Sequence, residues 1–398
     1  MTSVTVSAES RVLTFNRGSA TLKAALYDMS PIQVVLLIRV DRADSSRTQV
    51  TITDKSGKEL LDTPVESKTP HAALSTVFNW LEEHAYLSNI AAAGHRLVHG
   101  GLQFQEPARI TPDVLSQLQR LIPLDPDHLP AAIEIIRFIG TRLPHLPQIG
   151  CFDTSFHRTM TEVARMYALP RRFYDQGLMR FGFHGLSYEY ITGELGTFEG
   201  GLPERAIVAH LGSGASMAAL RRGECIDTSM GFTPLEGLVM SSRSGDVDPG
   251  ALFYMLEQDK MSPGDLYECL NKQSGLLGIS GSSGDMRDLL EKAAGDGRAA
   301  AAVDVFCYRA KKYIGSYAAA LGGLDVLVFT GGIGEKSAAV RSKICSNLEF
   351  LGIQLDPQRN RTNDPIISTA GSSVQVRVIE THEDLTIVRH VLKLIGRA

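Results

Sequence analysis

Short apolar runs alternate along the chain with segments in which apolar residues recur every three to four positions. The runs predict β-strands, and the periodic segments predict amphipathic helices. The predicted strands cover residues 34–40, 49–53, 96–98, 149–152 and 326–329. The predicted helices cover residues 72–83, 130–143, 263–270, 299–321 and 337–348, and a last helix follows at 385–395. Strands and helices that alternate in this way indicate α/β layers, in which helices cover sheets.

One strand–turn–strand pattern occurs twice, at Gly18-Ser19 and, half a chain later, at Gly212-Ser213. In each copy an apolar run precedes the glycine, and Ala-Ala-Leu follows four residues after the serine. We interpret the pair as a duplicated α/β unit, with coincidence as the alternative. A glycine turn between strands can direct several backbone N–H groups at phosphate oxygens, although most such turns are plain hairpins. The two domains are predicted at 1–155 plus 385–398 and at 156–384.

Composition narrows the classes of function. The 398 residues allow two or three domains, and 40 Lys and Arg against 44 Asp and Glu leave a net charge of −4. No overall basic field attracts nucleic acid or anionic lipid, so neither is an expected partner. The start of the chain lacks the pattern of a secretory signal, and its longest apolar run is too short to cross a bilayer, so we expect a cytoplasmic protein. Five separated cysteines without a C-x-x-C pair predict buried free thiols rather than disulfides or a zinc site.

A third glycine cluster, Gly331 to Glu335, follows the predicted strand 326–329 and opens a helix. Such a junction lets a nucleotide lie against backbone N–H groups. Its spacing does not fit the dinucleotide fingerprint G-x-G-x-x-G, and no G-x-x-x-x-G-K-[ST] loop occurs in the chain. The sequence therefore predicts nucleotide binding without either of these two common loops.

Charged residues stand where strands end. Arg96 and Arg243 lie in glycine-flanked turns, where their planar forks of donors suit carboxylate or phosphate oxygens; exposed loop arginines are the alternative. Asp153 closes a strand and Glu383 precedes the last helix, positions also typical of turns and helix caps. Together with phosphate-binding turns, these carboxylates suggest Mg²⁺, which takes one or two carboxylates plus phosphate oxygens and water.

Seven blocks in order make the chain resemble the acetate and propionate kinase family of the actin, Hsp70 and sugar kinase (ASKHA) superfamily. The blocks are Asn16-x-Gly18-Ser19, Gly94-His95-Arg96-Leu97-Val98-His99-Gly100-Gly101, Phe152-Asp153-Thr154-Ser155-Phe156-His157, Phe181-Gly182-Phe183-His184-Gly185, Asp227 to Gly237, Arg243-Ser244-Gly245-Asp246 and Ser274 to Gly281. The resemblance implies α/β architecture with two duplicated ribonuclease H-like domains that face a central cleft. It implies ATP/ADP and Mg²⁺, with Mn²⁺ as an alternative, a homodimer, and reversible formation of acetyl phosphate from acetate.

The resemblance also implies roles for single residues. The catalytic residues would be Arg96, Asp153, His184 and Arg243, and the metal would be held by Asn16, Asp153 and Glu383. The acyl substrate would meet Arg96, Val98, Leu124, Phe183 and Pro234. The nucleotide would meet His210, Leu211, Gly212, Ser213, Gly214, Asp285, Met286, Arg287, Gly332, Ile333, Gly334, Glu335 and Lys336. Independently of the resemblance, the hydroxyls of Ser19 and Thr21 and the ammonium group of Lys23 make the first glycine turn a further candidate for binding the nucleotide phosphates.

Four positions depart from the family pattern. Asp125 stands where the family usually has histidine, and Ser213, Lys336 and His382 stand where asparagine is usual. The first change removes a donor for the phosphoryl group unless His128 reaches the same place. We therefore expect a lowered acetate kinase activity, or a changed acceptor or phosphate donor. The alternatives are a propionate or butyrate kinase, and a nucleotide-dependent regulatory protein on the same fold.

Overall fold

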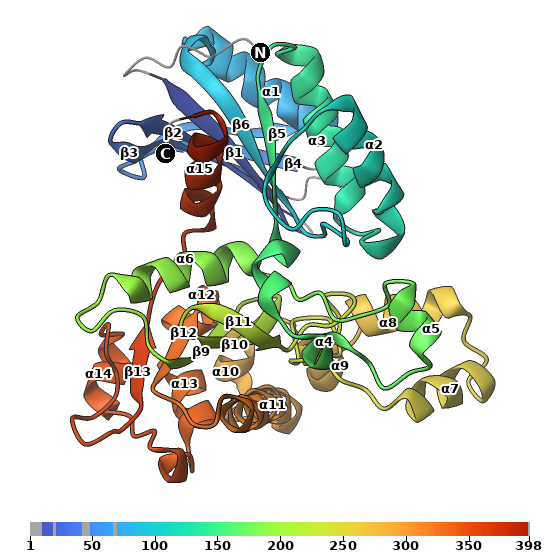
Figure 1. Cartoon of the computed structure of the whole chain (residues 1–398), viewed down its shortest axis with the longest axis vertical. Coiled ribbons are helices and arrows are strands. Elements are labelled where there is room, and N and C mark those ends of the chain that lie inside the picture. Colours follow the sequence, from blue (N-terminus) through green and yellow to red (C-terminus); the bar gives the residue numbers. More distant parts are fainter. Residues whose placement is uncertain (1–9, 19–20, 42–47, 67–69, 397–398) are drawn as a thin grey trace. The chain divides into compact units, whose positions relative to one another are not determined.

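The computed structural model describes residues 10–18, 21–41, 48–66 and 70–396 of the chain (Figure 1). The chain divides into two compact units. Unit 1 comprises Met1–Ser155 and His382–Ala398, and unit 2 comprises Phe156–Thr381. Residues 382–384, which the sequence analysis assigned to the second domain, belong to unit 1 because the helix that starts at Glu383 packs there.

Unit 1 is built on an eight-stranded sheet in the order β5-β4-β3-β2-β1-β6-β8-β7. Strands β5 to β1 are antiparallel neighbours, β6 and β8 continue the sheet in parallel with β1, and β7 is an antiparallel edge strand. The strands are β1 (Arg11–Arg17), β2 (Thr21–Met29), β3 (Ile32–Asp41), β4 (Thr48–Asp54), β5 (Glu59–Val65), β6 (Ile90–Leu97), β7 (Ala108–Arg109) and β8 (Gln148–Phe152). The helices are α1 (Pro70–Glu83), α2 (Pro112–Arg120), α3 (Leu129–Arg142) and α15 (Glu383–Leu394), and 3₁₀ turns occur at Leu87–Asn89, Ile122–Leu124 and Asp153–Thr159.

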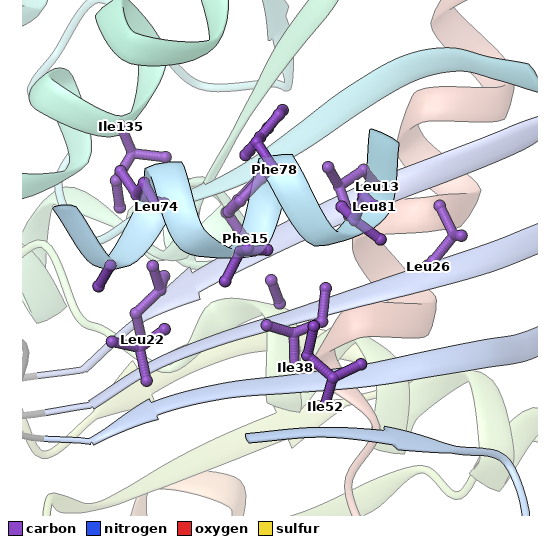
Figure 2. Packing of buried hydrophobic residues seen from close by; sticks show 14 of the residues in the cluster. Leu13, Phe15, Leu22, Leu26, Ile38, Ile52, Leu74, Phe78, Leu81 and Ile135 are labelled. Carbon is purple, nitrogen blue, oxygen red and sulfur yellow. The ribbon is translucent and has the colours of Figure 1, made fainter. Parts of the chain in front are cut away.

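The core of unit 1 lies where helix α1 covers β1 to β4 (Figure 2). Alternate strand positions supply Leu13 and Phe15 to this core, as a period of two requires of a sheet with one covered face. Leu74, Phe78 and Leu81 come from α1, where spacings of three and four place them on one helix face. All five side chains are at most 2% exposed.

Helix α15 returns the end of the chain to unit 1 and packs on β1, β6 and β8. The approach is close at Gly94 in β6, where an added Cβ atom would lie 2.3 Å from Cγ2 of Ile387. Only glycine leaves room for the helix at this position. The predicted return of the last helix to the first half of the chain is confirmed, and it brings Glu383 to this sheet.

Unit 2 is built on a five-stranded sheet in the order β11-β10-β9-β12-β13. The strands are β9 (Arg205–Leu211), β10 (Ala215–Arg221), β11 (Glu224–Thr228), β12 (Val326–Thr330) and β13 (Gln375–Val378). The helices are α4 (Glu162–Arg165), α5 (Arg171–Asp175), α6 (Gly185–Gly196), α7 (Pro249–Glu257), α8 (Pro263–Lys272), α9 (Gly275–Ser280), α10 (Met286–Lys292), α11 (Gly297–Leu321), α12 (Gly331–Lys336), α13 (Ala338–Cys345) and α14 (Pro357–Thr362), with a 3₁₀ turn at Glu349–Leu351.

The two sheets share one strand pattern. Unit 1 contains β3-β2-β1-β6-β8 and unit 2 contains β11-β10-β9-β12-β13. In each, the first three strands are antiparallel and the last two run parallel to the third. Both predicted strand–turn–strand motifs are confirmed, as the hairpins β1–β2 and β9–β10. The common order supports the interpretation of the chain as a duplicated unit.

The predicted strands and helices are found, with three differences. The strand predicted at 96–98 is the end of a longer strand, β6, which covers Ile90–Leu97 and excludes Val98. The helix predicted at 337–348 ends at Cys345, because Ser346 leaves helical dihedral angles and Asn347 has a φ of 58°. The glycine cluster is itself a short helix, α12, which begins directly after β12. Gly331 starts this helix with a φ of 75°, a backbone angle that side chains other than glycine rarely adopt.

The structure bears on two expectations from the sequence, the state of the cysteines and the lack of a membrane-spanning segment. All five cysteines are free thiols, as predicted, and four of them are buried, whereas Cys269 is half-buried. Within the described ranges, no helix combines the length and the apolar character needed to cross a membrane, the 25-residue α11 included.

Two buried histidines make the stability of the fold depend on pH. His95 and His157 are at most 2% exposed, and burial lowers the pKa of each imidazole to about 4. In the unfolded chain each imidazole has its ordinary pKa of about 6.5. Between pH 6.5 and pH 4 the unfolded state therefore binds more protons than the folded state, and lowering the pH favours unfolding. We expect each to lower the free energy of unfolding by about 2 kcal/mol between pH 7 and pH 5. Urea titrations at both pH values check this, and equal unfolding free energies would contradict it.

Candidate active site

Arg96, at the end of β6, lies at the centre of a polar cluster in unit 1. Its Nε and Nη2 donate to the two carboxylate oxygens of Asp153, at 3.1 Å to Oδ1 and 2.6 Å to Oδ2. Its Nη1 donates to Oδ1 of Asn16 at 3.0 Å, and Nδ2 of Asn16 donates to Oε2 of Glu383 at 2.7 Å. Asp153 is fully buried, and the side chains of Arg96 and Glu383 are 13% and 14% exposed. The structure thus brings together the predicted catalytic and metal-binding residues that belong to unit 1, which are Asn16, Arg96, Asp153 and Glu383.

The sheet explains why residues so far apart in sequence meet. Asn16 and Arg96 lie near the carboxyl ends of the parallel neighbours β1 and β6, and Asp153 directly follows β8, the next parallel strand. Parallel strands end at one edge of a sheet, where polar groups from different strands converge. Glu383 reaches the cluster because α15 begins beside these strands.

The cluster holds more negative than positive charge. Burial works against the charge of Arg96, but the carboxylates of Asp153 and Glu383 outweigh this effect and raise its pKa above the usual value. Burial, and then the charge of Glu383, raise the pKa of the neighbouring carboxyl of Asp384 to about 6. One guanidinium against Asp153 and Glu383 leaves a net charge of −1, so the cluster favours an additional cation.

These residues fit a hard divalent ion. Glu383, Asp153 and Asn16 offer carboxylate and amide oxygens, the donor chemistry that Mg²⁺ prefers. Within the part of the chain that the structure describes, no group of three or more His, Cys, Asp or Glu side chains could form a closed metal cage. Mg²⁺ does not need such a cage when phosphate oxygens and water complete its coordination.

Other predicted residues of unit 1 have different surroundings. Ser19 lies outside the described residues. The hydroxyl of Thr21 donates to Oδ1 of Asp41 at 3.1 Å, whereas Lys23 is exposed and pairs with Asn16 across β1 and β2. Val98 is 8% exposed, and Leu124 packs against the apolar cluster that contains Leu97 and Phe152.

Unit 2 brings His184 and Arg243 to the β9–β10 turn. A Cβ atom added at Gly214 in this turn would lie 3.3 Å from Nε2 of His184 and 3.8 Å from Nη1 of Arg243. Nη1 of Arg243 also donates to the carbonyl oxygen of Pro234 at 2.9 Å, so the predicted acyl-site residue Pro234 lies at the same place. Two cationic or potentially cationic groups therefore flank a glycine turn whose backbone is open to a ligand.

Hydrogen bonds and stacking hold His184 in one orientation. His184 precedes α6 with a φ of 59°, in the left-handed region. Its Nδ1 contacts Oγ of Ser216 at 2.8 Å, and its ring stacks on His210 with centroids 4.3 Å apart. Since Ser216 occupies Nδ1, Nε2 is the imidazole atom that faces Gly214. This arrangement suits a fixed hydrogen-bond donor.

The predicted nucleotide residues of the glycine cluster adjoin the same turn. Thr330 pairs with His210 across β12 and β9, and a Cβ atom on Gly331 would lie 2.7 Å from the carbonyl oxygen of Leu211. Oε1 of Glu335 accepts from the backbone N–H groups of Gly331 and Thr381, at 2.8 Å and 3.1 Å. Glu335 was predicted to meet the nucleotide, and these bonds show that its carboxylate also holds the start of α12.

The remaining predicted residues divide into exposed and buried groups. Gly332 and Lys336 are exposed on α12, Ile333 is half-buried and Gly334 is buried. Asp285 caps α10 by accepting from the backbone N–H of Arg287, and the guanidinium of Arg287 also pairs with the carboxylate of Asp285 at 2.6 Å. Met286 is buried.

Gly212 and Ser213 form the tip of the β9–β10 turn. Phe183 is 1% exposed, and its carbonyl oxygen accepts a hydrogen bond from Nε2 of His157.

Sequence patterns missed two supports of this site. Arg341 is fully buried in α13, and its Nη1 donates to the carbonyl oxygens of Gly334 and Glu335 at the end of α12. Ser187 contacts Nδ1 of His210 and Oγ1 of Thr381, at 2.8 Å and 2.9 Å. Nothing in their local sequence distinguishes these residues from ordinary helix positions, because each acts through a contact with a distant segment.

Comparisons with known proteins agree with the family resemblance found in the sequence. Residues 11–389 match the family model described as the Acetokinase family. The acetate kinase of Rhodopseudomonas palustris (strain ATCC BAA-98 / CGA009) is 42% identical to this chain, and the match covers 96% of this chain and 98% of that protein. The acetate kinase of Coprothermobacter proteolyticus is 44% identical to this chain, and the match covers 97% of this chain and 99% of that protein.

Solved structures give the same result. A propionate kinase from Francisella tularensis superposes with a TM-score of 0.91 at 37% identity, covering 96% of this chain and 98% of that one. The acetate kinase of Porphyromonas gingivalis superposes with a TM-score of 0.88 at 37% identity, and the match covers 97% of this chain and 100% of that one. Both confirm the predicted α/β fold class, and the matches along the whole sequence confirm the resemblance. The chain belongs to the acetokinase family.

Proposed function

We propose that this phosphotransferase catalyses the reversible, Mg²⁺-dependent transfer of the γ-phosphoryl group of ATP to acetate, which yields acetyl phosphate and ADP. The observation that carries the proposal is the cluster in which Arg96 is held by Asp153, Asn16 and Glu383. A binding or regulatory protein has no need of an arginine kept in place by a fully buried carboxylate at a strand edge. His184, Gly214 and Arg243 in unit 2 support the same reaction.

The chemistry requires neutralisation of charge rather than proton abstraction. A carboxylic acid with a pKa near that of a glutamate side chain, about 4.3, is already ionised at pH 7, so the acceptor needs no general base. It must approach an anionic phosphoryl group that passes through a loose, in-line transition state. Arg96 and Arg243 supply fixed positive charge, and Nε2 of His184 supplies a donor for the transferring group.

The proposal gives the two arginines different roles. Three of the five N–H groups of Arg96 serve Asp153 and Asn16, and the other two can contact an acceptor carboxylate. Arg243 is held through the carbonyl oxygen of Pro234 and can meet the phosphoryl oxygens. Asn16, Asp153 and Glu383 would hold Mg²⁺, which when bound neutralises charge on the nucleotide phosphates.

A hydroxylamine trap tests the proposal. With MgATP and acetate, the chain should produce ADP and acetyl hydroxamate in equal amounts, and EDTA should abolish both products. ADP formed without hydroxamate would contradict kinase activity toward a carboxylate. Nucleotide binding without turnover would instead favour the regulatory alternative.

The same assay separates the acyl substrates. The Francisella tularensis relative is described as a propionate kinase, so propionate is the second candidate acceptor, and butyrate extends the series. Val98, Leu124, Phe183 and Pro234 would set the limit on chain length. Because Asp125, Ser213, Lys336 and His382 depart from the family pattern, we expect a lowered rate with acetate or a changed acceptor or donor. An ordinary high rate with acetate and ATP would contradict that expectation.

The proposal includes a homodimer, which the family resemblance implies, and the cytoplasmic location expected in the sequence analysis. Light scattering after size exclusion measures the first, and fractionation of cells measures the second.

A further inference from the structure

A chain of hydrogen bonds inside unit 2 ends at the imidazole of His184. Nδ1 of His184 lies 2.8 Å from Oγ of Ser216, and the hydroxyl oxygen of Tyr188 lies 2.5 Å from the same Oγ. Ser216 and Tyr188 are fully buried, whereas Nε2 of His184 faces Gly214 in the β9–β10 turn. The chain therefore runs from a buried phenol to the ring that borders this turn.

Helix geometry and packing fix the phenol of Tyr188. The N–H of Tyr188 donates to the carbonyl oxygen of His184 at 3.1 Å, and a spacing of four residues brings the two side chains to the same side of α6. The ring of Tyr188 lies against the rings of Phe156 and His157, with centroids 5.8 Å and 5.6 Å away. Because packing holds the ring, the hydroxyl meets Ser216 in a fixed position.

The order of donors along the chain decides which nitrogen of His184 carries the hydrogen. The Oγ of Ser216 contacts both Tyr188 and Nδ1, but a serine hydroxyl has a single hydrogen to donate. The phenol is the stronger acid of the two hydroxyl groups and hence the stronger donor, so we assign Tyr188 as the donor to Oγ. The hydrogen of Ser216 then points at Nδ1, which must accept it. In a neutral imidazole whose Nδ1 accepts, the hydrogen lies on Nε2.

The neighbouring ring of His210 makes a neutral imidazole the favoured state. His210 stacks on His184 with centroids 4.3 Å apart, and its own Nδ1 lies 2.8 Å from Oγ of Ser187, a second buried serine. Two imidazolium rings at this distance would repel each other. The stack thus makes the hydroxyl chain, rather than a second ring proton, the source of an Nε2–H donor at His184.

We propose that Tyr188 is a positioning residue for phosphoryl transfer: through Ser216, its hydroxyl keeps the hydrogen of His184 on Nε2, where it can donate to the transferring group. The inference rests on the proposed function for the identity of that group. Without the phenol hydroxyl, Ser216 can accept from Nδ1–H instead. Nε2 then turns a lone pair toward the anionic phosphoryl oxygens and gives the transition state no hydrogen bond.

The nitrogen spectrum of His184 tests the tautomer without turnover. In protein made with ¹⁵N-labelled histidine, at about pH 7.5, we expect Nδ1 of His184 to resonate as an unprotonated nitrogen and Nε2 as a protonated one. His184→Gln identifies the signals. Tyr188→Phe keeps the ring contacts and should move most of the population to the Nδ1–H tautomer. A protonated Nδ1 in the unsubstituted protein, alone or together with a protonated Nε2, would overturn the proposal. An unchanged tautomer in Tyr188→Phe would overturn it as well.

Steady-state rates test the consequence for catalysis. If about one ring in ten keeps Nε2–H in Tyr188→Phe, kcat should fall about tenfold, because only that fraction is competent. The KM values for ATP and acetate should stay within about twofold, since the lost interaction belongs to the transition state. The residual kcat should therefore match the Nε2–H fraction in the spectrum. More than half of kcat in Tyr188→Phe, or a tenfold loss without a change of tautomer, would overturn the proposal.

Tyr317→Phe is the matched control. Tyr317 is a tyrosine of the same unit that is 2% exposed, and its hydroxyl has no hydrogen-bond partner among the residues that the structure describes. The substitution removes a buried phenol hydroxyl, as Tyr188→Phe does, but one outside the chain that ends at His184. It should leave kcat and the tautomer of His184 unchanged.

A double-mutant cycle tests whether Tyr188 acts through Ser216. Ser216→Ala should lower kcat at least as much as Tyr188→Phe, and the double variant should be no slower than Ser216→Ala alone. Additive losses would overturn this part. If a variant does not fold, the spectrum of the unsubstituted protein still decides the tautomer. If the unsubstituted chain makes no hydroxamate, the proposed function fails, and the spectra still decide whether Tyr188 sets the tautomer of His184.

Discussion

Arg243→Ala should lower kcat about 10³- to 10⁵-fold, the effect of removing an arginine from a transferring phosphoryl group. The side chain flanks Gly214 together with His184, and it is held by a hydrogen bond to the carbonyl oxygen of Pro234. Its bonds to the carbonyl oxygen of Pro234 and to Sδ of Met240 go to uncharged acceptors, and the loss of such a bond costs about 1 kcal/mol, so the fold should remain intact. Steady-state rates with MgATP and acetate, together with a urea titration, measure both quantities.

Arg221→Ala is the matched control for that substitution. Arg221 belongs to the same unit and also donates to a backbone carbonyl, that of Leu321, at 3.2 Å. It lies away from the β9–β10 turn, at the far end of β10. Its loss should change stability to a similar extent and leave kcat unchanged. If Arg243→Ala kept most of its activity, the role assigned to Arg243 would be wrong.

Arg96→Ala should abolish activity and also destabilise unit 1, unlike Arg243→Ala. The substitution leaves Asp153, which is fully buried, without the guanidinium that binds both of its oxygens. Removing one partner of a buried ion pair costs about 3–5 kcal/mol. Urea titration and the hydroxamate assay should therefore both show large losses.

The paired variant Arg96→Met with Asp153→Leu separates the two effects. It removes both charges at once and should regain much of the stability, because apolar residues can replace a buried ion pair. Activity should stay lost, since the acceptor and the metal would have no partners. A single Arg96→Ala variant as stable as the unsubstituted protein would contradict the buried-pair argument.

The site was predicted in parts of different quality. Arg96, Asp153 and Glu383 were singled out because charged residues at strand ends and helix starts can bind ligands, although such positions are also typical of turns and helix caps. Glu335 was assigned to the nucleotide through the glycine cluster and the family resemblance, and the structure adds that its carboxylate accepts from the N–H groups of Gly331 and Thr381. A motif identifies a turn but does not state which of its side chains the turn itself uses.

Asp125 illustrates the opposite case. Its sequence context marked a departure from a family pattern and left the role of His128 open. The contact at 2.8 Å between the two side chains shows that they form a pair. That information depends on the fold of residues 121–129, which pack on Leu97 and Phe152, and spacing along the chain does not contain it.

Local periodicity and chemical identity were enough to predict many of the strands and helices, the two related hairpins and the residue types that neutralise phosphate and carboxylate. Which of these residues meet depends on the packing of segments that are distant in the chain. Asn16, Arg96, Asp153 and Glu383 come from segments up to 367 positions apart, and they converge only because parallel strands end at one edge and α15 returns to that sheet. Contacts of this kind depend on packing over the whole unit, which no local pattern specifies.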